Sequence, residues 1–584
     1  MTPSGTGPEV RSDGLKLYNN SRVAVIGAGP AGSFFAYFLL QFAQRIGLNL
    51  QVDIFEPKDF SQPGTKSCNM CGGIVSESLV QNLAAEGIHL PTKVVQRSID
   101  SYYLHMDVGS ARIQTPGEEK RIASVHRGGG PRGIRDIRYT SFDGYLLALA
   151  LEKGARQVDR RVEGVDWSAG RPRLRTPAGG AELYDLLVVA SGINSYSPKL
   201  LEGLTGSYQP PRTTKTYIAE YYLGKETIKV YLGSAMHVFL LDLPRLEFAA
   251  LIPKGDYVTL CLLGLDIDKP LVDSFLSSPV VKECLPPNWQ APEDFCHCSP
   301  RINIAGAVQP FGDRLVFIGD AGVTRLYKDG IGAGYRTAKA AAKTAVFHGV
   351  STEDFRQHYW PVCRSIASDN AIGKFVFSVS GLVKKSRLAR RSVWRMVSRE
   401  QRTEGATRRL SSVLWDTFTG SAPYRDVFLR TLHPAFWSRL LLNLVVAAWP
   451  RSLKRRQRRE FMISGVLGKY YRDGEVIYRQ GEAGDSMYVV QKGQVEVLRR
   501  DGDQEYCLAV LGEEEFFGET AIFADDVRST TVRALGDTCV LTLEKGDFLR
   551  RVHEDPALAF RMMEKMAHRI RELEEAMVRT AHVA

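Results

Sequence analysis

Glycines at a fixed spacing near the start of the sequence could hold a phosphate group. The turn that carries them reads Gly27-Ala28-Gly29-Pro30-Ala31-Gly32. It follows a short apolar run at residues 23–26 and precedes an apolar stretch that ends near Arg45. The first glycine permits a tight turn, the second lets backbone approach a pyrophosphate, and the third lets a helix pack closely on a strand. A helix that begins here would direct free N–H groups at phosphate charge.

An acidic residue stands where such a fold needs one. A second apolar run, residues 51–55, ends on Glu56, whose carboxylate can accept hydrogen bonds from both ribose hydroxyls of an adenosine. Strand, glycine turn, helix, strand and acid follow one another in the order of a Rossmann-type unit. The sequence therefore predicts a dinucleotide site at this turn.

A second glycine-rich segment indicates which dinucleotide binds. An apolar run at residues 315–318 leads into Gly319-Asp320, and a small-residue helix is expected after further glycines. Those glycines are Gly330, Gly332 and Gly334. The segment resembles the second FAD motif of the large flavoprotein hydroxylase and reductase superfamily. The resemblance implies that the aspartate holds the ribityl chain and that the glycines let backbone approach the isoalloxazine. The two motifs together predict FAD.

Details between these motifs resemble the geranylgeranyl reductase family, over about residues 20–430. The family carries Cys-Gly-Gly after the ribose-binding acid, matched here by Cys71-Gly72-Gly73, and an arginine before Phe-Asp, matched by Arg138. The resemblance implies that Arg138, Gly72 and Gly73 contact FAD. It also implies that Cys71 lies over the flavin as a catalytic residue that protonates or positions an apolar, lipid-like or quinone-like substrate. The alternative is that Cys71 is only a small residue on the flavin face.

Two departures from the superfamily pattern leave the substrate and the electron donor open. Pro253 and Lys254 match a later family segment, but its second aromatic and its phenylalanine are absent. Ala190-Ser191-Gly192 stands where the superfamily usually has Ala-Asp-Gly. The donor is thus NAD(P)H, a ferredoxin or a quinone pool. A flavin monooxygenase of the same fold and a non-enzymatic scaffold that senses flavin and nucleotide are alternatives to the leading hypothesis, an FAD-dependent reductase.

The cysteine spacing does not predict a metal site. Cys68 and Cys71 form one C-x-x-C, and Cys296 and Cys298 form only a C-x-C. A structural zinc site needs four ligands, usually from two such pairs. We therefore expect no metal at these residues.

The C-terminal part resembles the cyclic-nucleotide-binding domain, across about residues 462–575. Short apolar strands alternate with glycine turns, followed by a Phe-Gly-Glu and a downstream arginine. The resemblance implies a phosphate cassette for cAMP or cGMP. Glu519 would bind the ribose 2′-hydroxyl and Arg528 the phosphate. The site residues are Phe517, Gly518, Glu519, Thr520, Arg528, Ser529 and Thr530. No helix-turn-helix follows before residue 584, so we expect no nucleic-acid partner.

A basic segment separates the two regions. Between Lys384 and Glu460 there are 19 Lys/Arg and 5 Asp/Glu, an excess of +14, against +11 for the whole chain. An apolar stretch at residues 440–449, flanked by Trp437 and Trp449, precedes the basic run at residues 454–459. This pattern is typical of an in-plane anchor on anionic lipid. A core-packing helix followed by a solvated basic linker explains it equally well.

These motifs require a multidomain α/β protein. With 584 residues the chain exceeds one hydrophobic core. We predict a flexible N-terminus (1–20), an FAD-binding Rossmann-like domain with an interleaved substrate-domain sheet (21–365), a basic helical connector (366–460), and a β-barrel of jelly-roll type with flanking helices (461–584). Neither a signal peptide nor a long apolar stretch is evident, so we expect a cytoplasmic protein, in one reading peripheral on the inner face of the membrane.

Overall fold

The computed structural model describes residues 15–571 apart from several gaps. The gaps are residues 65, 70, 116, 118, 133, 135–139, 178–180, 195–206, 403–407, 448–464, 503, 521, 523–526, 557, 561 and 565. The chain divides into two compact units. The first unit comprises Met1–Val75, Ser101–Ile113 and Ser124–Phe461, and the second comprises Ser76–Asp100, Gln114–Ala123 and Met462–Ala584.

A six-stranded sheet forms the centre of the first unit's nucleotide fold. Its order is β20-β21-β12-β1-β2-β8, and every neighbouring pair is parallel except β20 with β21. The strands are β20 (Phe311–Gly312), β21 (Leu315–Phe317), β12 (Leu186–Val189), β1 (Ser21–Ile26), β2 (Leu50–Phe55) and β8 (Arg156–Val158). The central strands are near-continuous Val, Leu and Ile runs because both faces of a parallel sheet are covered.

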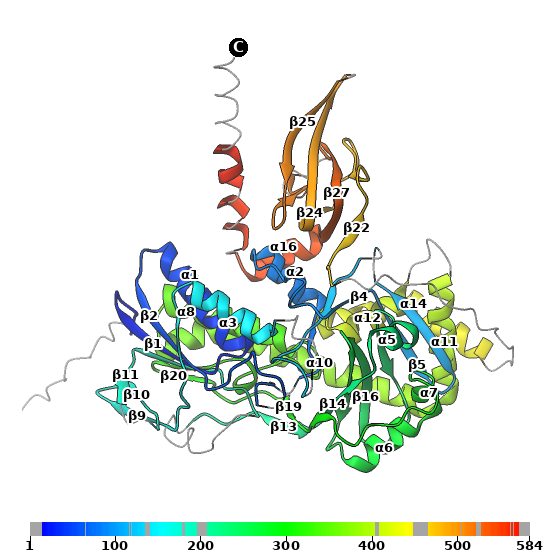
Figure 1. The fold of residues 1–584 in the computed structure, drawn as a ribbon, viewed down its shortest axis with the longest axis horizontal. Helices are drawn as coiled ribbons and strands as arrows, with labels where there is room; N and C mark the ends of the chain where they lie inside the picture. The colour runs from blue at the N-terminus through cyan, green and yellow to red at the C-terminus, as the bar shows by residue number, and fades with distance from the viewer. Residues whose placement is uncertain are drawn as a thin grey trace, which may run out of the picture. The chain divides into compact units, whose positions relative to one another are not determined.

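Helices cover one face of this sheet and a small sheet covers the other. Helices α1 (Pro30–Arg45), α8 (Gly330–Phe347) and α3 (Phe142–Glu152) lie side by side (Figure 1). On the opposite face, β9 (Gly164–Ser168) and β10 (Arg171–Arg175), with β11 (Ala181–Leu183), form an antiparallel sheet. Side chains of this sheet share one core cluster with β1, β12 and β21. The predicted doubly covered Rossmann-like fold is confirmed.

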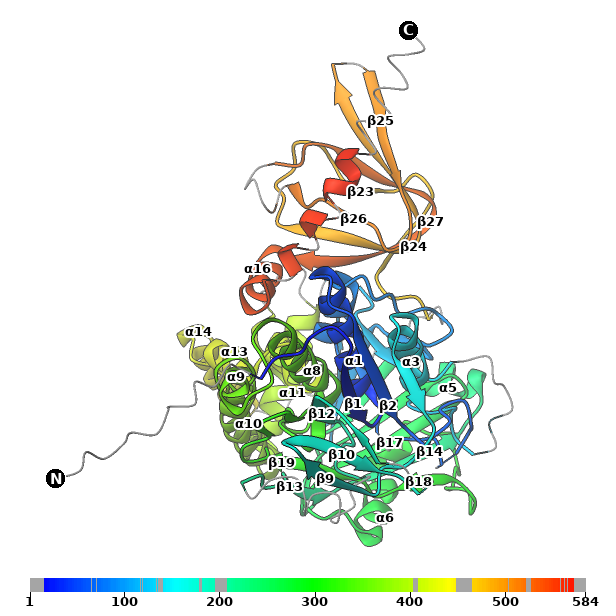
Figure 2. The same cartoon turned by 90° about the vertical axis from the view of Figure 1, so that its left-hand side faces the viewer.

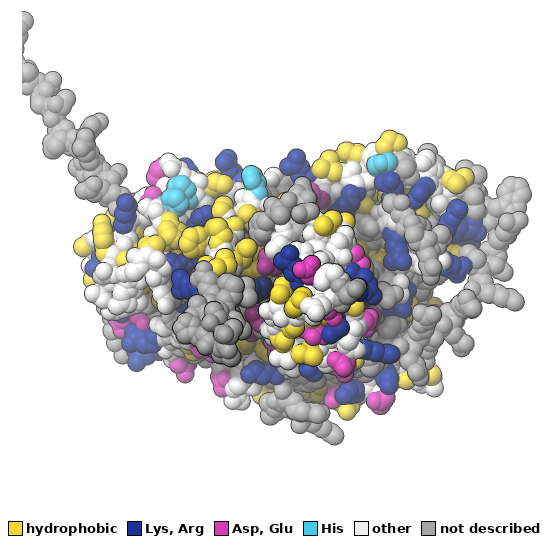
Figure 3. Space-filling view, turned by 90° about the horizontal axis from the view of Figure 1, so that it is seen from above, with side chains coloured by type: hydrophobic (Ala, Val, Ile, Leu, Met, Phe, Trp, Pro, Cys, Tyr) yellow, Lys and Arg dark blue, Asp and Glu magenta, His cyan; other side chains and the backbone are white. Residues whose placement is uncertain are grey.

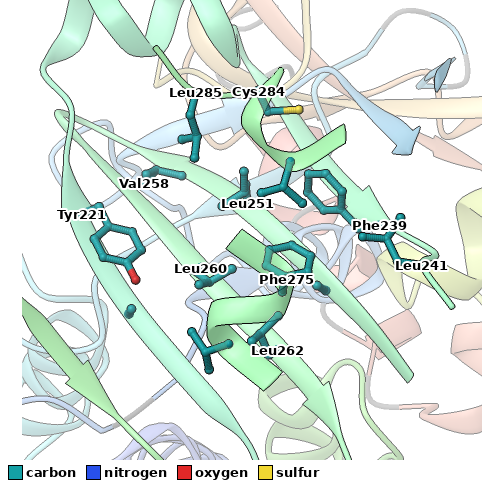
Figure 4. Close-up of a cluster of buried hydrophobic side chains, with 14 of the residues drawn as sticks. Tyr221, Phe239, Leu241, Leu251, Val258, Leu260, Leu262, Phe275, Cys284 and Leu285 are labelled. Atoms are coloured by element: carbon teal, nitrogen blue, oxygen red, sulfur yellow. The ribbon is translucent and has the colours of Figure 1, made fainter. Parts of the chain in front are cut away.

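A seven-stranded sheet forms another part of the first unit, in the region of the predicted substrate-domain sheet. Its order is β18-β14-β17-β16-β15-β5-β6. The strands are β18 (Cys296–Cys298), β14 (Tyr217–Tyr222), β17 (Tyr257–Gly264), β16 (Leu246–Lys254), β15 (Ala235–Phe239), β5 (Ser101–Met106) and β6 (Gly109–Gln114). Alternate residues of β14, β16 and β17 form an apolar cluster with α5 (Lys225–Tyr231), α6 (Lys269–Ser277) and α7 (Pro279–Lys282) (Figure 4). The other face of these strands carries polar and sulfur-containing side chains.

The shorter elements of the chain complete this description. In the first unit, β13 (Arg212–Lys215) pairs with β19 (Arg301–Ala305). The turn η2 (Gly319–Ala321) precedes α8, and α9 (Thr352–Asp354) and η3 (Phe355–Tyr359) follow it. Two short strands, β3 (Ile74–Val75) and β7 (Ile122–Ser124), lie where the chain passes between its units, and β4 (Arg97–Ile99) belongs to the second unit.

The region predicted as a connector is helical and belongs to the first unit over its described residues. It forms α10 (Trp360–Lys385), α11 (Arg387–Arg402), α12 (Arg409–Thr419), α13 (Tyr424–Thr431) and α14 (Pro434–Ala447). The Tyr424 hydroxyl donates to the Leu326 carbonyl at 2.6 Å, and Arg390 Nη2 lies 2.9 Å from Asp107 Oδ2. These helices therefore pack onto the rest of the first unit, with at least one of their basic side chains paired there.

The membrane prediction falls largely outside the described residues. Trp449 and the basic run at residues 454–459 are not described. None of the described helices combines the length and apolarity needed to cross a bilayer. On the face of the molecule in Figure 3, Lys and Arg side chains are interspersed with acidic and apolar ones.

The second unit is built around an antiparallel β-barrel (Figure 2). Its strands are β22 (Lys469–Tyr471), β23 (Val476–Tyr478), β24 (Ser486–Asp501), β25 (Gln504–Leu511), β26 (Phe516–Phe517) and β27 (Thr531–Glu544). Helix α16 (Lys545–Glu554) follows β27, and residues beyond Pro556 are helical where they are described. Helix α2 (Glu77–Ala85), which precedes the barrel by almost 400 residues, belongs to the same unit.

Candidate functional site

The first glycine turn leaves one face of its backbone open. Gly27 has φ +101°, and a Cβ there would lie 2.7 Å from the Ala190 carbonyl oxygen, so only glycine suits the turn. Gly32 packs against the Gly27 carbonyl and would collide with it if it carried a side chain. A Cβ on Gly29 would meet only Asn69 Nδ2 at 3.6 Å and an arginine nitrogen at 3.9 Å. The helix α1 N-terminus is thus accessible at Gly29, as the sequence predicts.

Glu56 lies at the end of β2 and is fixed by the backbone. It accepts from the Ala28 N–H at 3.0 Å and from the Lys58 N–H at 3.1 Å. Burial raises the pKa of Glu56, while these two hydrogen bonds oppose the rise. The carboxylate is therefore oriented before any ligand arrives.

The second glycine motif packs directly on the first. Gly319 has φ +60°, and a Cβ there would lie 2.7 Å from Ala31 Cβ. A Cβ on Gly334, in α8, would lie 3.6 Å from the same atom. Asp320 follows Gly319 and lines the same cavity as Gly29. A Cβ on Gly330 would lie 3.9 Å from Asp320 Oδ1. Ala31 thus joins two motifs that are almost 300 residues apart.

The remaining glycine of the second motif, Gly332, has a different role. It lies against the carboxylate of Asp329, the residue that precedes α8 with φ +57°. A side chain at Gly332 would collide with that carboxylate. Gly332 therefore permits the turn into α8 and is not among the residues that line the cavity described next.

A cavity of about 370 Å³ connects these residues. Its lining residues are Ile26, Gly27, Gly29, Phe55, Glu56, Pro57, Lys58, Cys68, Asn69, Arg160, Arg161, Val162, Ala190, Ser191, Gly192, Ile193, Asn194 and Asp320. The Ser191 hydroxyl is buried at this wall and has no hydrogen-bond partner among the described residues. Burial raises the pKa of Asp320, although its side chain opens onto the cavity. An elongated polar ligand would satisfy both groups.

An arginine that the sequence analysis did not name lies near Gly29. The predicted Arg138 lies outside the described residues. Arg127 approaches Gly29, and its Nη2 lies 3.0 Å from Asp143 Oδ2 in a bidentate ion pair. Asp143 and a hydrogen bond to Cys71 raise the pKa of Arg127 against burial, which lowers it. A sequence feature that could have indicated Arg127 is the run His126-Arg127-Gly128-Gly129-Gly130, because its glycines allow a close approach of backbone.

Cys71, Gly72 and Gly73 lie between this cavity and the substrate sheet. The Gly73 N–H donates to Cys71 Sγ at 3.4 Å. A Cβ on Gly72 would lie 3.7 Å from Cys261 Sγ, and one on Gly73 would lie 2.8 Å from Lys254 Nζ. The residues of the Cys-Gly-Gly segment therefore contact the polar face of β16 and β17.

That polar face holds a buried ion pair. Lys254 Nζ lies 3.1 Å from Glu220 Oε1, and the Thr259 hydroxyl donates to Glu220 at 2.9 Å. Lys254 is 1% exposed, so its ammonium and the carboxylate compensate each other away from water. The sequence named Lys254 only as a family match and missed Glu220 and Thr259, because strand pairing, not chain proximity, brings them together.

Two further groups on this face have altered acidity. Burial raises the pKa of Cys261 to about 12, so its thiol keeps its proton. Burial lowers the pKa of Lys328 to about 8, and its Nζ lies 3.9 Å from the centre of the Phe248 ring. A neutral thiol and an amine of lowered pKa thus lie near the buried ion pair of Lys254 and Glu220.

The nucleotide cassette in the second unit centres on Arg528. Arg528 is 3% exposed, donates to the Gly518 carbonyl at 2.9 Å and to the Ser486 hydroxyl at 3.3 Å, and lies over the Tyr478 ring at 4.3 Å. Its Nε has no partner among the described residues, and the buried Glu519 interacts with Arg528 electrostatically without a direct ion pair in the described residues. A buried guanidinium with so little compensation favours the binding of an anion.

The other cassette residues surround Arg528. Phe517 and Glu519 are buried, and burial raises the pKa of Glu519. Arg569, in the C-terminal helical segment, lies 3.4 Å from Glu519 Oε1. Thr520 is helical and exposed, and Ala521 is not described. Ser529 is exposed, and Thr530 is half-buried and hydrogen-bonds to Tyr478.

Comparison with known proteins supports the nucleotide domain. Residues 468–555 match the family model of the cyclic nucleotide-binding domain. The chain is 35% identical over 114 residues to the cyclic AMP receptor protein of Thermus thermophilus, covering 19% of this chain and 53% of that protein. It is 36% identical over 81 residues to a cAMP-dependent protein kinase regulatory subunit of Blastocladiella emersonii, covering 14% and 20%. The chain thus spans about half or less of the relatives it matches.

Solved structures similar to the first unit are flavoenzymes of low sequence identity. The halogenase PltM in complex with phloroglucinol and FAD is 13% identical with a TM-score of 0.47, and covers 73% of this chain and 91% of that chain. A 2-methyl-3-hydroxypyridine-5-carboxylic acid oxygenase is 13% identical with a TM-score of 0.43, covering 63% and 94%. Likeness of this degree carries no argument about activity, and the resemblance to geranylgeranyl reductases stays a prediction.

The Arg127–Asp143 pair yields a test of the site's architecture. Asp143 is fully buried, so Arg127→Met should lower the free energy of unfolding by about 3–5 kcal/mol, because it leaves a buried carboxylate without its partner. Arg127→Met combined with Asp143→Asn should recover much of that loss. Urea unfolding of the parent, Arg127→Met and the double variant measures the free energy of unfolding of each. A double variant as unstable as Arg127→Met would contradict the pairing.

Proposed function

We propose that the chain is an FAD-dependent oxidoreductase that reduces an apolar, lipid-like or quinone-like substrate. The observation that supports the proposal is the close packing of the second glycine motif on Ala31 of the first, with Glu56, Gly29 and Asp320 lining one cavity. A dinucleotide with an adenosine at one end and a flavin at the other has its polar groups in that order.

The residues at the cavity suit FAD. Glu56 would hold the adenosine ribose, and the α1 N-terminus at Gly29, with Arg127 beside it, would hold the pyrophosphate. Asp320 would hold the ribityl hydroxyls, and the unpartnered Ser191 hydroxyl gives the ligand one more polar contact. When bound, FAD would supply two-electron transfer to the substrate.

The polar face of the substrate sheet would serve the proton chemistry. Reduction of a carbon–carbon or carbonyl bond requires a proton as well as electrons. Lys328, with its pKa lowered to about 8, can give up a proton near neutral pH, and the neutral thiol of Cys261 keeps one. Cys71 would position the substrate between these groups and the flavin. Phe248 and Ile252 provide apolar contact area for the substrate.

We further propose that a cyclic nucleotide modulates this activity. In the second unit, Glu119 accepts from the Thr542 N–H of the barrel at 2.7 Å, and Arg121 pairs with Glu77 of α2 at 2.9 Å. The segment that carries α2 starts three residues after Gly73, and the segment that carries Arg121 leads within six residues to Arg127. The covalent chain therefore connects the barrel with the residues beside the cavity.

The remaining partners are also proposals. Electrons would come from NAD(P)H, a ferredoxin or a quinone pool, and the protein would act in the cytoplasm. The basic run at residues 454–459 would draw it to the anionic inner face of the membrane, where an apolar substrate is concentrated.

Loss of FAD from a glycine variant tests the cofactor site. Gly29→Ala adds a methyl group that meets nothing closer than 3.6 Å in the protein itself, so the fold should persist while the pyrophosphate loses its approach. We expect the parent to bind one FAD per chain and the variant to bind far less, measured by flavin absorbance after purification. Gly381→Ala, in α10, with no atom within 4 Å, is the matched control. Equal FAD in Gly29→Ala and the parent would refute this placement.

Removal of the cassette arginine tests the nucleotide site. Arg528→Ala deletes the buried cation that would meet the cyclic phosphate, and loss of such a partner typically costs about 2–5 kcal/mol, roughly thirtyfold or more in affinity. Calorimetry with cAMP and cGMP measures it. Arg533→Ala removes a more exposed arginine of the same barrel, paired with Glu496, and should bind like the parent. No heat from either nucleotide with the parent would reduce the barrel to a docking module.

A further inference from the structure

A buried cluster of two histidines and a cysteine lies in the substrate sheet, away from the cavity and the cassette. His105 comes from β5, His237 from β15, and Cys284 from the segment after α7. All three are buried, and one ligand atom from each lies within 4.8 Å of the others. Cys284 belongs to the apolar cluster on the helix-covered face of the sheet (Figure 4).

The distances within the cluster are close to those that one metal ion would impose. His105 Nε2 lies 2.9 Å from His237 Nδ1 and 3.7 Å from Cys284 Sγ. Ligand atoms about 2.0–2.3 Å from a common ion lie roughly 3–4 Å from one another. A small shift of the imidazoles would open the space between the three atoms.

The outer nitrogens of both rings have the partners that metal-binding histidines usually have. His237 Nε2 donates to the Leu232 carbonyl at 3.1 Å, which leaves Nδ1 as the free lone pair. His105 Nδ1 lies 2.7 Å from the Ser110 hydroxyl, so its proton can sit on Nδ1 and free Nε2. Such contacts fix the tautomer and the ring orientation of a ligand. Stacking of Phe239 on His105 and of Tyr103 on His237 further fixes the two rings.

We propose that His105 Nε2, His237 Nδ1 and Cys284 Sγ form a binding site for a soft monovalent ion, Cu(I). The net charge of the three ligands decides between Cu(I) and Zn²⁺. Two neutral imidazoles and one thiolate balance Cu(I), whereas Zn²⁺ would leave one positive charge in an apolar core, since no carboxylate of the described residues joins the cluster. Thiolate and imidazole are ligands that Cu(I) accepts.

Binding releases one proton. The Cys284 thiol loses its proton to solvent as the Cu–S bond forms, and the His105 proton moves from Nε2 to Nδ1, where Ser110 accepts it. Copper stays Cu(I) throughout, so no oxidant or reductant takes part. Because binding releases this proton, affinity for the ion should rise with pH.

Anaerobic titration of the full-length protein with Cu(I), against a copper-chelating competitor, tests the site. The parent should retain one more equivalent of Cu(I) per chain than Cys284→Ser, with one proton released. Cys363→Ser removes another buried thiol, one that hydrogen-bonds with Tyr359, and should behave like the parent. X-ray absorption of the parent at that stoichiometry should show one sulfur and two nitrogen neighbours, which keeps the test valid if a variant misfolds.

Three outcomes would overturn the proposal. These are equal Cu(I) retention by the parent and by folded Cys284→Ser, an absorption spectrum without the two-nitrogen, one-sulfur shell, or stoichiometric binding of Zn²⁺ at Cys284 with none of Cu(I). The first two would reduce the cluster to a hydrogen-bonded histidine pair in the core.

Discussion

Close approach of backbone at Ala31 is the constraint on which the proposed flavin site depends. Gly319 and Gly334 both face this methyl group, and Gly32 seats α1 on the Gly27 carbonyl. Any side chain at Gly319 or Gly32 would force the two motifs apart. Because α1 and α8 are held together in this way, Glu56 and Asp320 keep their places at the cavity although 264 positions separate them in the sequence.

Burial of charge organises both candidate sites in different ways. At the cavity, Asp143 compensates Arg127 within the protein, so that arginine is positioned before a ligand arrives. In the barrel, Arg528 hydrogen-bonds to a carbonyl and a hydroxyl and lies over an aromatic ring, while Glu519 acts on it only electrostatically. An anion would complete its compensation, whereas Arg127 is already compensated within the protein.

The sequence predicted the elements with a local signature and missed those made by long-range pairing. The sequence placed both glycine motifs and Glu56 next to strand and helix ends that the structure contains, because turn geometry restricts residue types over short spans, while their roles in binding stay predictions. Glu220 and Thr259 come together only through the pairing of β14 with β17. The sequence analysis did not identify the cluster of His105, His237 and Cys284, because cysteine spacing indicates a metal site only when the ligands are close in sequence.

The helices after residue 360 show a second limit of prediction from the sequence. The sequence predicted a basic helical connector and left a membrane anchor and a core-packing helix open. The structure shows helices α10 to α14 in the first unit, where Arg390 pairs with Asp107. Composition gives the net charge of a segment but not the partners of that charge.

Mass spectrometry of the small molecules released by denaturing the purified protein tests the central claim most directly. The account predicts FAD, near one per chain, because the cavity between Glu56 and Asp320 is arranged for that dinucleotide before it binds. NAD(P) in its place, or no dinucleotide even after incubation with FAD, would contradict it.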